Sequence, residues 1–579
     1  MKVKIPGVFD IPSLRPRLLE LLPCFGGGKT YRLPDFGKDL LAGFIVGIVA
    51  LPLSMAFSIS AGGSPAQGLY TAITAGFFVS LLGGSKFQIA GPTGAFVVII
   101  FGVVSEHGMA GLIAAGLLAG LMLLLMGLSG MGKYIKYIPY PVTTGFTTGI
   151  GVLIFSQQVK DFLGLEIDNI SPAFFEKWAD HFHYLGTFNP VVFAVGAGTL
   201  AAIVILRRIA PRLPAAALAV GAATLLCYFL KLPEASRPVE TIGTRFGGIP
   251  SSLPLPVLPH INWSLIRTVL PDAFTIALLA AIESLLSAVV ADSMTGDRHN
   301  ANMELVAQGI GNIASAFFGA IPATGAIART ATNIKSGAVS PVAGIVHALT
   351  LLVFILFLAP AASAIPLASL AAVLIVVSWD MSNLGRFIRL IKRSSKSDSI
   401  VLFTTFAFTV AFDLTFAVEV GVILAVFLFL RRMIEVSAIK MGNSDVLTQL
   451  AYGEIGATTR DKMTALSRRH IEVYEITGPF FFGVADMLQN TLRNVSGAPR
   501  VLILRMKDVP AVDSTGITAL ESFLSQCRAR KIRLIITELQ GRTRRSLEKA
   551  GIIRDLGAEN IIDTFDESIE AASEEVKRG

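Results

Sequence analysis

The stretch Ile321–Asn333 reads IPATGAIARTATN and lies deep inside a run of hydrophobic segments. It carries the triplet Thr324-Gly325-Ala326 just after a proline and has Arg329 as its one charged residue, and it is too short and too polar to cross a bilayer. Far upstream, Gly91–Phe96 reads GPTGAF and again places a Thr-Gly-Ala triplet after a proline, at the start of an apolar run. Two matching interruptions, one in each half of the chain, are typical of an inverted-repeat transporter.

The overall composition is that of a polytopic membrane protein. The chain has 579 residues, of which 53% are hydrophobic and 16% are charged, and its mean hydropathy is +0.65. Most of it must therefore lie in hydrocarbon rather than around one aqueous core. Residues 1–38 are basic and interrupted by prolines, so we expect a cytoplasmic N-terminal segment without a secretory signal.

The cysteines and the net charge exclude several other classes. Cys24, Cys227 and Cys527 are far apart and lack the spacing of a zinc site or a disulfide framework. We therefore expect free thiols, no structural metal and no cofactor. The net charge of +8 comes from Lys and Arg in loops beside apolar segments, where they fix topology, so nucleic-acid binding is not expected.

Fourteen apolar segments are long enough to cross the bilayer or to enter it as half-helices. The first seven lie near residues 39–60, 66–82, 90–104, 110–130, 141–159, 188–206 and 214–230. The second seven lie near 270–291, 304–320, 324–334, 337–360, 366–379, 399–412 and 415–430. The third and tenth hold the two triplets and fall short of the roughly 20 residues of a full span, which predicts half-helices. Because seven is odd, the second repeat is inverted and the two half-helix ends would face each other near the midplane.

Basic residues accumulate in alternate loops, as expected for the cytoplasmic side of a membrane protein. These loops carry Lys86, Lys133, Lys136, Arg207, Arg208, Arg212, Arg298, Lys335, Arg386, Arg389, Lys392, Arg393 and Lys396. One loop on the opposite side is acidic, with Asp161, Glu166, Asp168, Glu176 and Asp180. Both termini are therefore predicted to be cytoplasmic.

After residue 432 the composition becomes that of a soluble domain. Strand-like runs at 471–477, 500–506 and 532–539 alternate with amphipathic helical patterns near 484–494, 515–529 and 542–549, and a last helix is expected at 566–577. This alternation predicts a small α/β domain. The predicted domains are the N-terminal segment 1–38, the transmembrane transport domain 39–432, and the cytoplasmic C-terminal domain with its linker, 433–579.

Several motifs resemble the sulfate permease (SulP) family, the bacterial relatives of the prestin-like anion carriers of solute carrier family 26. They are the segment Val49–Phe57, the sequence PAQGLY at Pro65–Tyr70, and the segment Ala291–Asn312. The sequence DSTG at Asp513–Gly516 resembles the signature of the STAS domain, which anti-sigma factor antagonists share. The resemblance covers nearly the whole chain in order, and residues 321–333 with 376–384 are most similar to the bacterial branch that includes C4-dicarboxylate carriers.

The resemblance implies a seven-plus-seven inverted repeat with a core and a gate domain, assembled as a homodimer. It also implies that an anion is held between the facing ends of the third and tenth helices. Carried over residue by residue, the site would be lined by Phe57, Thr93, Gly94, Ala95, Thr324, Gly325, Ala326, Ile327, Ala328 and Arg329.

Helix N-termini account for the anion chemistry of such a site. The first turn of any helix offers unpaired N–H groups and about half a positive charge, so anions bind there readily. Helix breaks that only allow close packing are the alternative, but the matched pair favours a site. A buried arginine in a membrane costs on the order of 3 kcal/mol or more. Arg329 is therefore interpreted as a source of positive potential, with bracing of backbone carbonyls as the alternative.

Glu283 is the lone acid of residues 273–291, the apolar body of the eighth segment, and lies in the sequence AIESLLS at 281–287. A carboxylate in apolar surroundings readily takes up a proton, and a protonated Glu283 would cancel one charge of an imported anion. The resemblance implies a coupling site here, for a proton or, with Ser287 and half-helix carbonyls, for Na⁺. We favour the proton because only one acid is available. A neutral glutamate with a purely structural role is the other interpretation.

Two further motifs bear on other functions. The sequence GGGKT at Gly26–Thr30 is similar to the end of a P-loop but lacks the first glycine, where Pro23 stands, so ATP binding is not expected. Neither domain has a Ser/His/Asp set, so we do not expect an enzyme.

In the C-terminal domain, Ser514 follows Asp513 where a strand should turn into a helix, and we place Ser514 as the N-cap. Phosphorylation is the alternative, regulatory role of Ser514. The C-terminal domain as a whole is expected to act in docking, either by dimerising or by transmitting the binding of a cytoplasmic partner to the transport domain.

Together these features predict a secondary active anion transporter in the cytoplasmic (inner) membrane of a bacterium, coupled to protons and moving by an elevator-type mechanism. Sulfate, C4-dicarboxylates and bicarbonate are all candidate substrates, because backbone N–H donors accept each of them. A Na⁺-coupled bicarbonate carrier, an anion channel and a membrane anion sensor are the alternatives.

Overall fold

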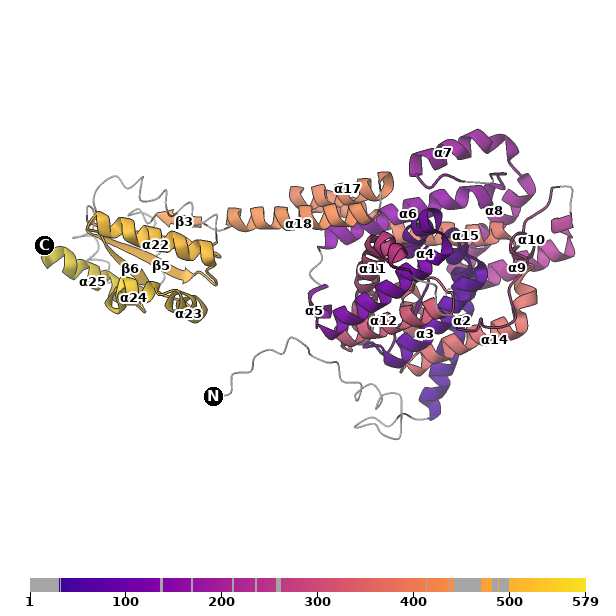
Figure 1. The fold of residues 1–579 in the computed structure, drawn as a ribbon, viewed down its shortest axis with the longest axis horizontal. Helices are drawn as coiled ribbons and strands as arrows, with labels where there is room; N and C mark the ends of the chain where they lie inside the picture. Colours follow the sequence, from indigo (N-terminus) through magenta and orange to yellow (C-terminus); the bar gives the residue numbers. More distant parts are fainter. Residues whose placement is uncertain are drawn as a thin grey trace. The chain divides into compact units, whose positions relative to one another are not determined.

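The computed structural model describes residues 31 and 33–578 with internal gaps. Outside it lie residues 1–30, 32, 136–138, 168–169, 211–212, 235–236, 257–261, 413, 437, 442–469, 482–487, 489–498 and 579. Most of the predicted N-terminal segment and of the helix near 484–494 therefore lie outside the described residues. The chain forms two compact units, Met1–Ala425 and Val426–Gly579, each of which is described by itself (Figure 1).

The first half of the membrane unit follows the predicted segments. Its main elements are α2 (Leu33–Ser60), α3 (Pro65–Leu82), β1 (Ala90–Gly91), α4 (Gly94–Leu128), α6 (Tyr140–Leu163), α8 (Pro190–Ile209) and α9 (Ala215–Phe229). The third and fourth predicted segments are joined in α4, which is broken at Gly108 by a backbone φ of 66°. The third segment therefore starts as the short strand β1 and becomes helical only at Gly94.

The second half repeats this order of elements. It consists of α11 (Trp263–Thr295), α12 (Ala301–Phe317), β2 (Thr324–Gly325), α13 (Ile327–Lys335), α14 (Val342–Ala362), α15 (Leu367–Ser382), α17 (Lys396–Ala411) and α18 (Leu414–Val436). The predicted domain boundary after residue 432 falls inside α18. Within the described residues, seven helical stretches are long and apolar enough to cross a membrane.

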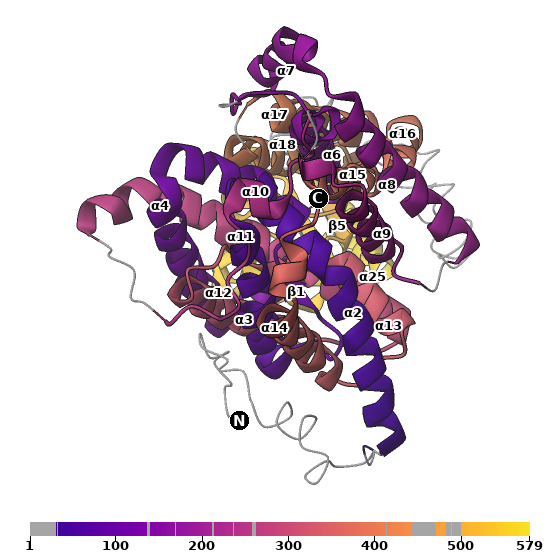
Figure 2. The ribbon, with the colours of Figure 1, turned by 90° about the vertical axis from the view of Figure 1, so that its right-hand side faces the viewer.

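The helices of the membrane unit pack as two bundles (Figure 2). The first, which we name the core bundle, contains α2, α3, α4, α11, α12, α13 and α14. The second, the gate bundle, contains α6, α8, α9, α15, α17 and α18, the last of which contacts α6 and α17 through Gly421. Backbone contact between small residues makes the core bundle tight, because a Cβ at Gly120 of α4 would lie 2.9 Å from the Gly309 carbonyl of α12.

Shorter elements lie between the spans, outside the predicted segments. They are α5 (Gly132–Ile135), α7 (Phe174–His183), α10 (Ile242–Phe246), α16 (Leu384–Arg393) and the 3-10 turns Tyr184–Thr187 and Leu232–Glu234. A search for long apolar runs passes over α7 and α16 because polar and apolar residues alternate in them with a helical period.

Helix α7 buries a lysine between the two bundles. α7 packs on α6 and α17 of the gate bundle, and Lys177 is buried with its ammonium 5.3 Å from the ring centroid of Phe101, in α4 of the core bundle. His181, one turn further on, is 2.9 Å from the Ser156 carbonyl of α6. Loss of hydration on burial lowers the pKa of Lys177 from 10.5 to about 8.

Lys177→Met is expected to stabilise the protein at neutral pH. At pH 7 the lysine is charged in both the folded and unfolded states, so its burial costs on the order of 3 kcal/mol, partly offset by the contact with Phe101. Between pH 8 and 10.5 the folded state loses this proton first, so the stability of the wild type should rise with pH.

The measurement is the apparent melting temperature of both proteins in detergent at a series of pH values. The methionine side chain of the variant cannot titrate, so the advantage of the variant should be largest near pH 7 and should shrink as the pH approaches 10.5. A difference that stays constant over this range would show that the charge of Lys177 is not its cause.

The C-terminal unit is a five-stranded sheet covered by helices, in the order β3-β4-β5-β6-β7. Its strands within the described residues are β3 (Ala438–Met441), β4 (Ile471–Thr477), β5 (Val501–Asp508), β6 (Arg533–Thr537) and β7 (Ile561–Ile562). The pair β3 and β4 is antiparallel, and the other neighbouring strands are parallel. The helices are α22 (Ser514–Ala529), α23 (Gly541–Lys549), α24 (Ile552–Leu556) and α25 (Phe565–Arg578), with a 3-10 turn at Ala558–Asn560. Alternate residues of β5 face opposite sides, where Leu502 and Leu504 pack under α22 and Val501 and Ile503 under α25.

Candidate anion site

Two short strands bring the two Thr-Gly-Ala triplets together. β1 and β2 pair antiparallel, with Ala90 opposite Gly325 and Gly91 opposite Thr324. The Ala326 N–H also donates to the Ile89 carbonyl at 2.8 Å. Helices α4 and α13 begin directly after this pair, at Gly94 and Ile327, so the two half-helix ends meet in the middle of the core bundle.

The first turns of both half-helices present N–H groups without protein partners. In the part of the chain that the structure describes, the N–H groups of Gly94 and Ala95 in α4 donate to no carbonyl or side-chain oxygen. The same holds for Ile327, Ala328 and Arg329 in α13. Neither N-cap residue, Thr93 or Ala326, supplies a capping side chain. These donors are free for an anion.

Apolar residues of both bundles surround the end of α4. A Cβ at Gly94 would lie 2.7 Å from Met381 Sδ, 3.0 Å from Ile154 Cδ1 and 3.3 Å from Phe57 Cε1. Phe57 belongs to α2 of the core bundle and was expected here. Met381 of α15 and Ile154 of α6 belong to the gate bundle and were missed, because their place depends on packing between bundles and neither has a local sequence signal.

Glu283 lies directly beside the predicted anion site. The Thr93 hydroxyl donates to Glu283 Oε2 at 3.3 Å, and the glutamate side chain is buried, with 8% of the residue exposed. Glu283 has no basic partner among the described residues. Thr93 directly precedes Gly94 in the sequence, so its hydroxyl holds a lone carboxylate beside the first N–H groups of α4.

Hydroxyl groups of α11 hold the second triplet in place. The Gly325 N–H donates to Ser284 Oγ at 2.9 Å, and Ser284 Oγ lies 2.9 Å from Thr324 Oγ1. Thr324 also donates to the Ala280 carbonyl at 3.1 Å. Ser287 donates to Thr330 Oγ1 of α13 at 3.2 Å, so the structure brings Ser287 to the half-helix and shows no bond between it and Glu283.

Arg329 is buried behind the facing helix ends, with 2% of the residue exposed. Its Nη2 donates to the Pro92 carbonyl, which joins α13 to the residue before the first triplet. Its Nη1 has no partner within the described residues, and the same is true of both ring nitrogens of the buried His347 in α14. The arginine therefore braces the loop before α4 and also places a cation next to the paired triplets.

Comparison with known proteins identifies the family and the domains of the chain. The family model described as the sulfate permease family matches residues 36–405, and the model of the STAS domain matches residues 462–571. The chain belongs to the sulfate permease family. The protein is thus a multi-pass membrane anion transporter with a C-terminal STAS domain, and its relatives are transporters rather than enzymes.

Relatives of this permease carry two different substrate names. It is 42% identical over 545 residues to "Putative sulfate transporter YvdB" of Bacillus subtilis (strain 168), which covers 94% of this chain and 99% of that protein. It is 29% identical over 547 residues to "Bicarbonate transporter BicA" of Picosynechococcus sp., which covers 92% of this chain and 94% of that protein.

Two solved structures are similar to the permease. The transmembrane domain of a cyanobacterium bicarbonate transporter BicA has a TM-score of 0.59 at 30% identity and covers 68% of this chain and 98% of that one. The murine Slc26a9 anion transporter in the inward-facing state has a TM-score of 0.83 and covers 94% of this chain and 92% of that one. The second likeness, at 18% identity, concerns the fold alone.

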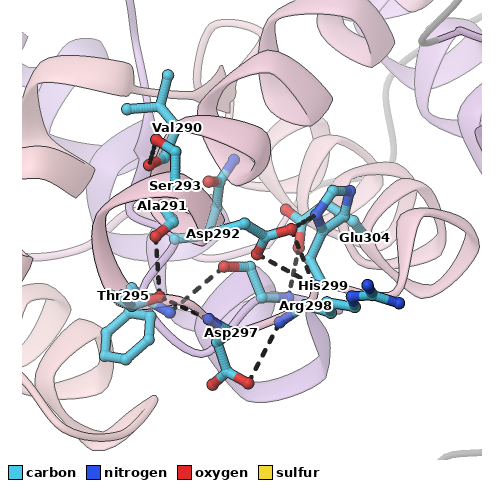
Figure 3. A network of polar contacts seen from close by, with 12 residues as sticks. Val290, Ala291, Asp292, Ser293, Thr295, Asp297, Arg298, His299 and Glu304 are labelled. Carbon is cyan, nitrogen blue, oxygen red and sulfur yellow. Dashed lines mark hydrogen bonds and ion pairs between the residues drawn. The ribbon is translucent and has the colours of Figure 1, made fainter.

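A second polar cluster of the permease lies at the turn between α11 and α12 (Figure 3). Asp292 Oδ2 and His299 Nδ1 are 2.7 Å apart, and Lys86 pairs with Asp297 at 2.9 Å. Glu304 is fully buried and accepts from the Ser85 N–H at 3.1 Å. These bonds tie α12 to the loop after α3, which gives the cluster a structural role within the core bundle.

In the STAS domain the helix cap differs from the expected one. Asp513, not Ser514, is the N-cap of α22, and its carboxylate accepts from the Gly516 N–H at 2.7 Å. Ser514 is the first helical residue and is exposed. Asp and Ser are almost equally good caps, so local preference alone could not choose between these neighbours.

Proposed function

We propose that this permease is a secondary active transporter that moves a small anion of the sulfate or C4-dicarboxylate class together with a proton. The contact between Thr93 and Glu283 carries this proposal, because it joins the N-cap residue of the anion-binding helix α4 to a buried carboxylate. An anion bound at the free N–H groups of Gly94 and Ala95 would lie close to Glu283. The negative charge of the anion would repel a negative charge on the Glu283 carboxylate. Binding of the anion would therefore favour the protonated glutamate.

The proposed transport cycle divides the work between three features. The N–H groups at the two facing helix ends hold the anion without a full ion pair, so that it can also leave. Arg329 adds positive potential from behind, and Glu283 takes up the proton that neutralises one negative charge. Since both half-helices belong to the core bundle, an elevator-type movement of this bundle past Met381 and Ile154 of the gate bundle would carry the anion across.

Sulfate is the substrate that we favour within this class. The support is the name of the relative that is 42% identical over nearly the whole chain. A Na⁺-coupled bicarbonate carrier is the second candidate, and the similarity to BicA proteins in sequence and structure favours it. In that case Glu283, Ser287 and half-helix carbonyls would hold the cation.

The charge distribution in the loops also bears on cellular location and topology. We place it in the inner membrane of a bacterium, with both termini cytoplasmic, on the basis of the basic loops and the bacterial relatives. A homodimer is expected from the family resemblance. The STAS domain would dock against a cytoplasmic partner or a second copy, and the exposed Ser514 leaves regulation by phosphorylation as the alternative.

Uptake by proteoliposomes distinguishes these functions. We expect labelled sulfate to accumulate inside vesicles when a proton gradient is directed inward, and not when Na⁺ replaces it. Accumulation of bicarbonate with Na⁺ alone would support the second candidate instead. Labelled fumarate tests the dicarboxylate branch. A flux that never exceeds equilibrium would indicate a channel, and the absence of any flux would indicate a sensor.

A further inference from the structure

Helix α16 has an apolar stripe that no part of the described chain covers. Leu384, Ile388 and Ile391 are 42%, 48% and 43% exposed. Their spacing of four and three residues places them on one side of the helix. The helix has no fully buried residue, and it lies at the periphery of the gate bundle (Figure 2).

The opposite side of α16 is strongly basic. Arg386, Arg389, Lys392 and Arg393 are all exposed, and the helix contains no acidic residue. None of the four forms an ion pair within the described residues, and the one side-chain bond among them is from Arg389 Nε to the Gly385 carbonyl of the same helix, at 3.1 Å. Four cations without an ion-pair partner among the described residues thus lie on the side of α16 away from the apolar stripe.

A third side fixes α16 to the gate bundle. The rings of Phe387 and of Phe406 in α17 have centroids 5.2 Å apart, and α16 packs on α6 and α17. The helix follows α15 directly, through Asn383 with a left-handed φ of 39°. The candidate membrane span Leu367–Arg393 comprises α15 and α16, and the basic residues of α16 favour the membrane surface for this end of the span.

We propose that α16 is a membrane anchor that binds anionic phospholipids of the leaflet at which α15 ends. Its apolar stripe would enter the boundary between headgroups and acyl chains, and its four cations would lie beside the lipid phosphates. A membrane fits this surface better than a protein does, since the stripe is narrow, the charge has a single sign and the helix leaves a transmembrane span. The apolar side thus suits the acyl chains at the membrane surface, and the basic side suits the headgroup phosphates.

The anchor would act on the anion site through α15. Met381, which lies against the Gly94 position, is two residues before the left-handed Asn383 at which α16 begins. Lipid binding to α16 would therefore hold the wall of the anion site still while the core bundle moves. This consequence rests on the proposed transport function, whereas lipid binding by itself does not.

The test uses the full chain and phosphatidylglycerol as the probe. Purified protein in phosphatidylcholine nanodiscs is compared with protein in phosphatidylcholine mixed with phosphatidylglycerol, and both its melting temperature and the phosphatidylglycerol retained on delipidation are measured. Each basic residue near an anionic surface contributes about fivefold to binding. The double variant Arg386→Gln/Arg389→Gln should thus retain phosphatidylglycerol roughly 25-fold less tightly, and added salt should weaken retention by the wild type.

A matched control exists in the STAS domain. Arg542 and Arg545 have the same spacing on an exposed helix after a glycine, and Arg545 Nε donates to the Gly541 carbonyl at 3.1 Å, as Arg389 does to Gly385. Arg542→Gln/Arg545→Gln should leave lipid retention unchanged, whereas Ile388→Ser should weaken it in both lipid mixtures. Equal retention by the two double variants, or no preference for phosphatidylglycerol over phosphatidylcholine, would overturn the proposal. Neither readout requires transport, so a failure of the proposed function would be recognised separately.

Discussion

Glu283→Gln should abolish the response of anion accumulation to a proton gradient while leaving anion exchange across the membrane intact. Glutamine has nearly the shape of a protonated glutamate and can still accept from Thr93, but it cannot release a proton. With the membrane potential clamped, coupling to one proton gives about tenfold more accumulation for each tenfold proton gradient. The variant should lose this whole factor. The measurement is uptake of labelled sulfate by proteoliposomes at several external pH values.

Two controls separate coupling from damage to the fold. Glu304→Gln removes another buried carboxylate, one that bonds to the Ser85 N–H away from the anion site, and should lower stability without changing the pH response. Thr93→Val removes the hydroxyl next to Glu283 and leaves the carboxylate in place, so it should weaken anion binding and keep the coupling. If Glu283→Gln still responds fully to the proton gradient, the coupling role is wrong.

The half-helices could be predicted from the sequence because their signals are local. A proline followed by Thr-Gly-Ala inside an apolar stretch predicts a helix that begins part-way along that stretch. The pairing of β1 with β2 confirms that the N-terminal ends of the two half-helices meet. The order of apolar segments likewise agrees with the observed helices, since hydrophobicity and length suffice to predict a membrane span. The break at Gly108 within α4 was also located, as a gap between two predicted segments.

What the sequence did not reveal depends on contacts between distant segments. Met381 and Ile154 face Gly94 only because the gate bundle packs against the core bundle. The local sequence of an apolar helix does not indicate which of its apolar residues faces a site in another bundle. The roles of α7 and α16 were missed for a different reason. Their residues alternate between polar and apolar with a helical period, which predicts a surface helix but not the partner of each face.

Arg329→Ala should raise the KM for anion uptake by roughly 10- to 100-fold, while the protein still inserts and folds. A hydrogen bond or close contact to a charged group contributes about 1.5–3 kcal/mol, and about 1.4 kcal/mol corresponds to a factor of ten in affinity. Arg329 is buried beside the paired triplets, so water screens its field only weakly. The measurement is the concentration dependence of sulfate uptake, with the amount of folded protein in the vesicles determined separately.

Arg329→Lys separates the field of the arginine from its bond to the Pro92 carbonyl. Lysine keeps the positive charge but not the planar guanidinium, so affinity near that of the wild type in this variant would assign the effect to the field. If Lys and Ala lower affinity and melting temperature equally, bracing of Pro92 is the role instead. Lys335→Ala is the matched control, because it removes an exposed cation from the other end of the same helix, where solvent screens the charge, and it should leave the KM unchanged. An unaltered KM in Arg329→Ala would show that the backbone N–H groups hold the anion without help from the arginine.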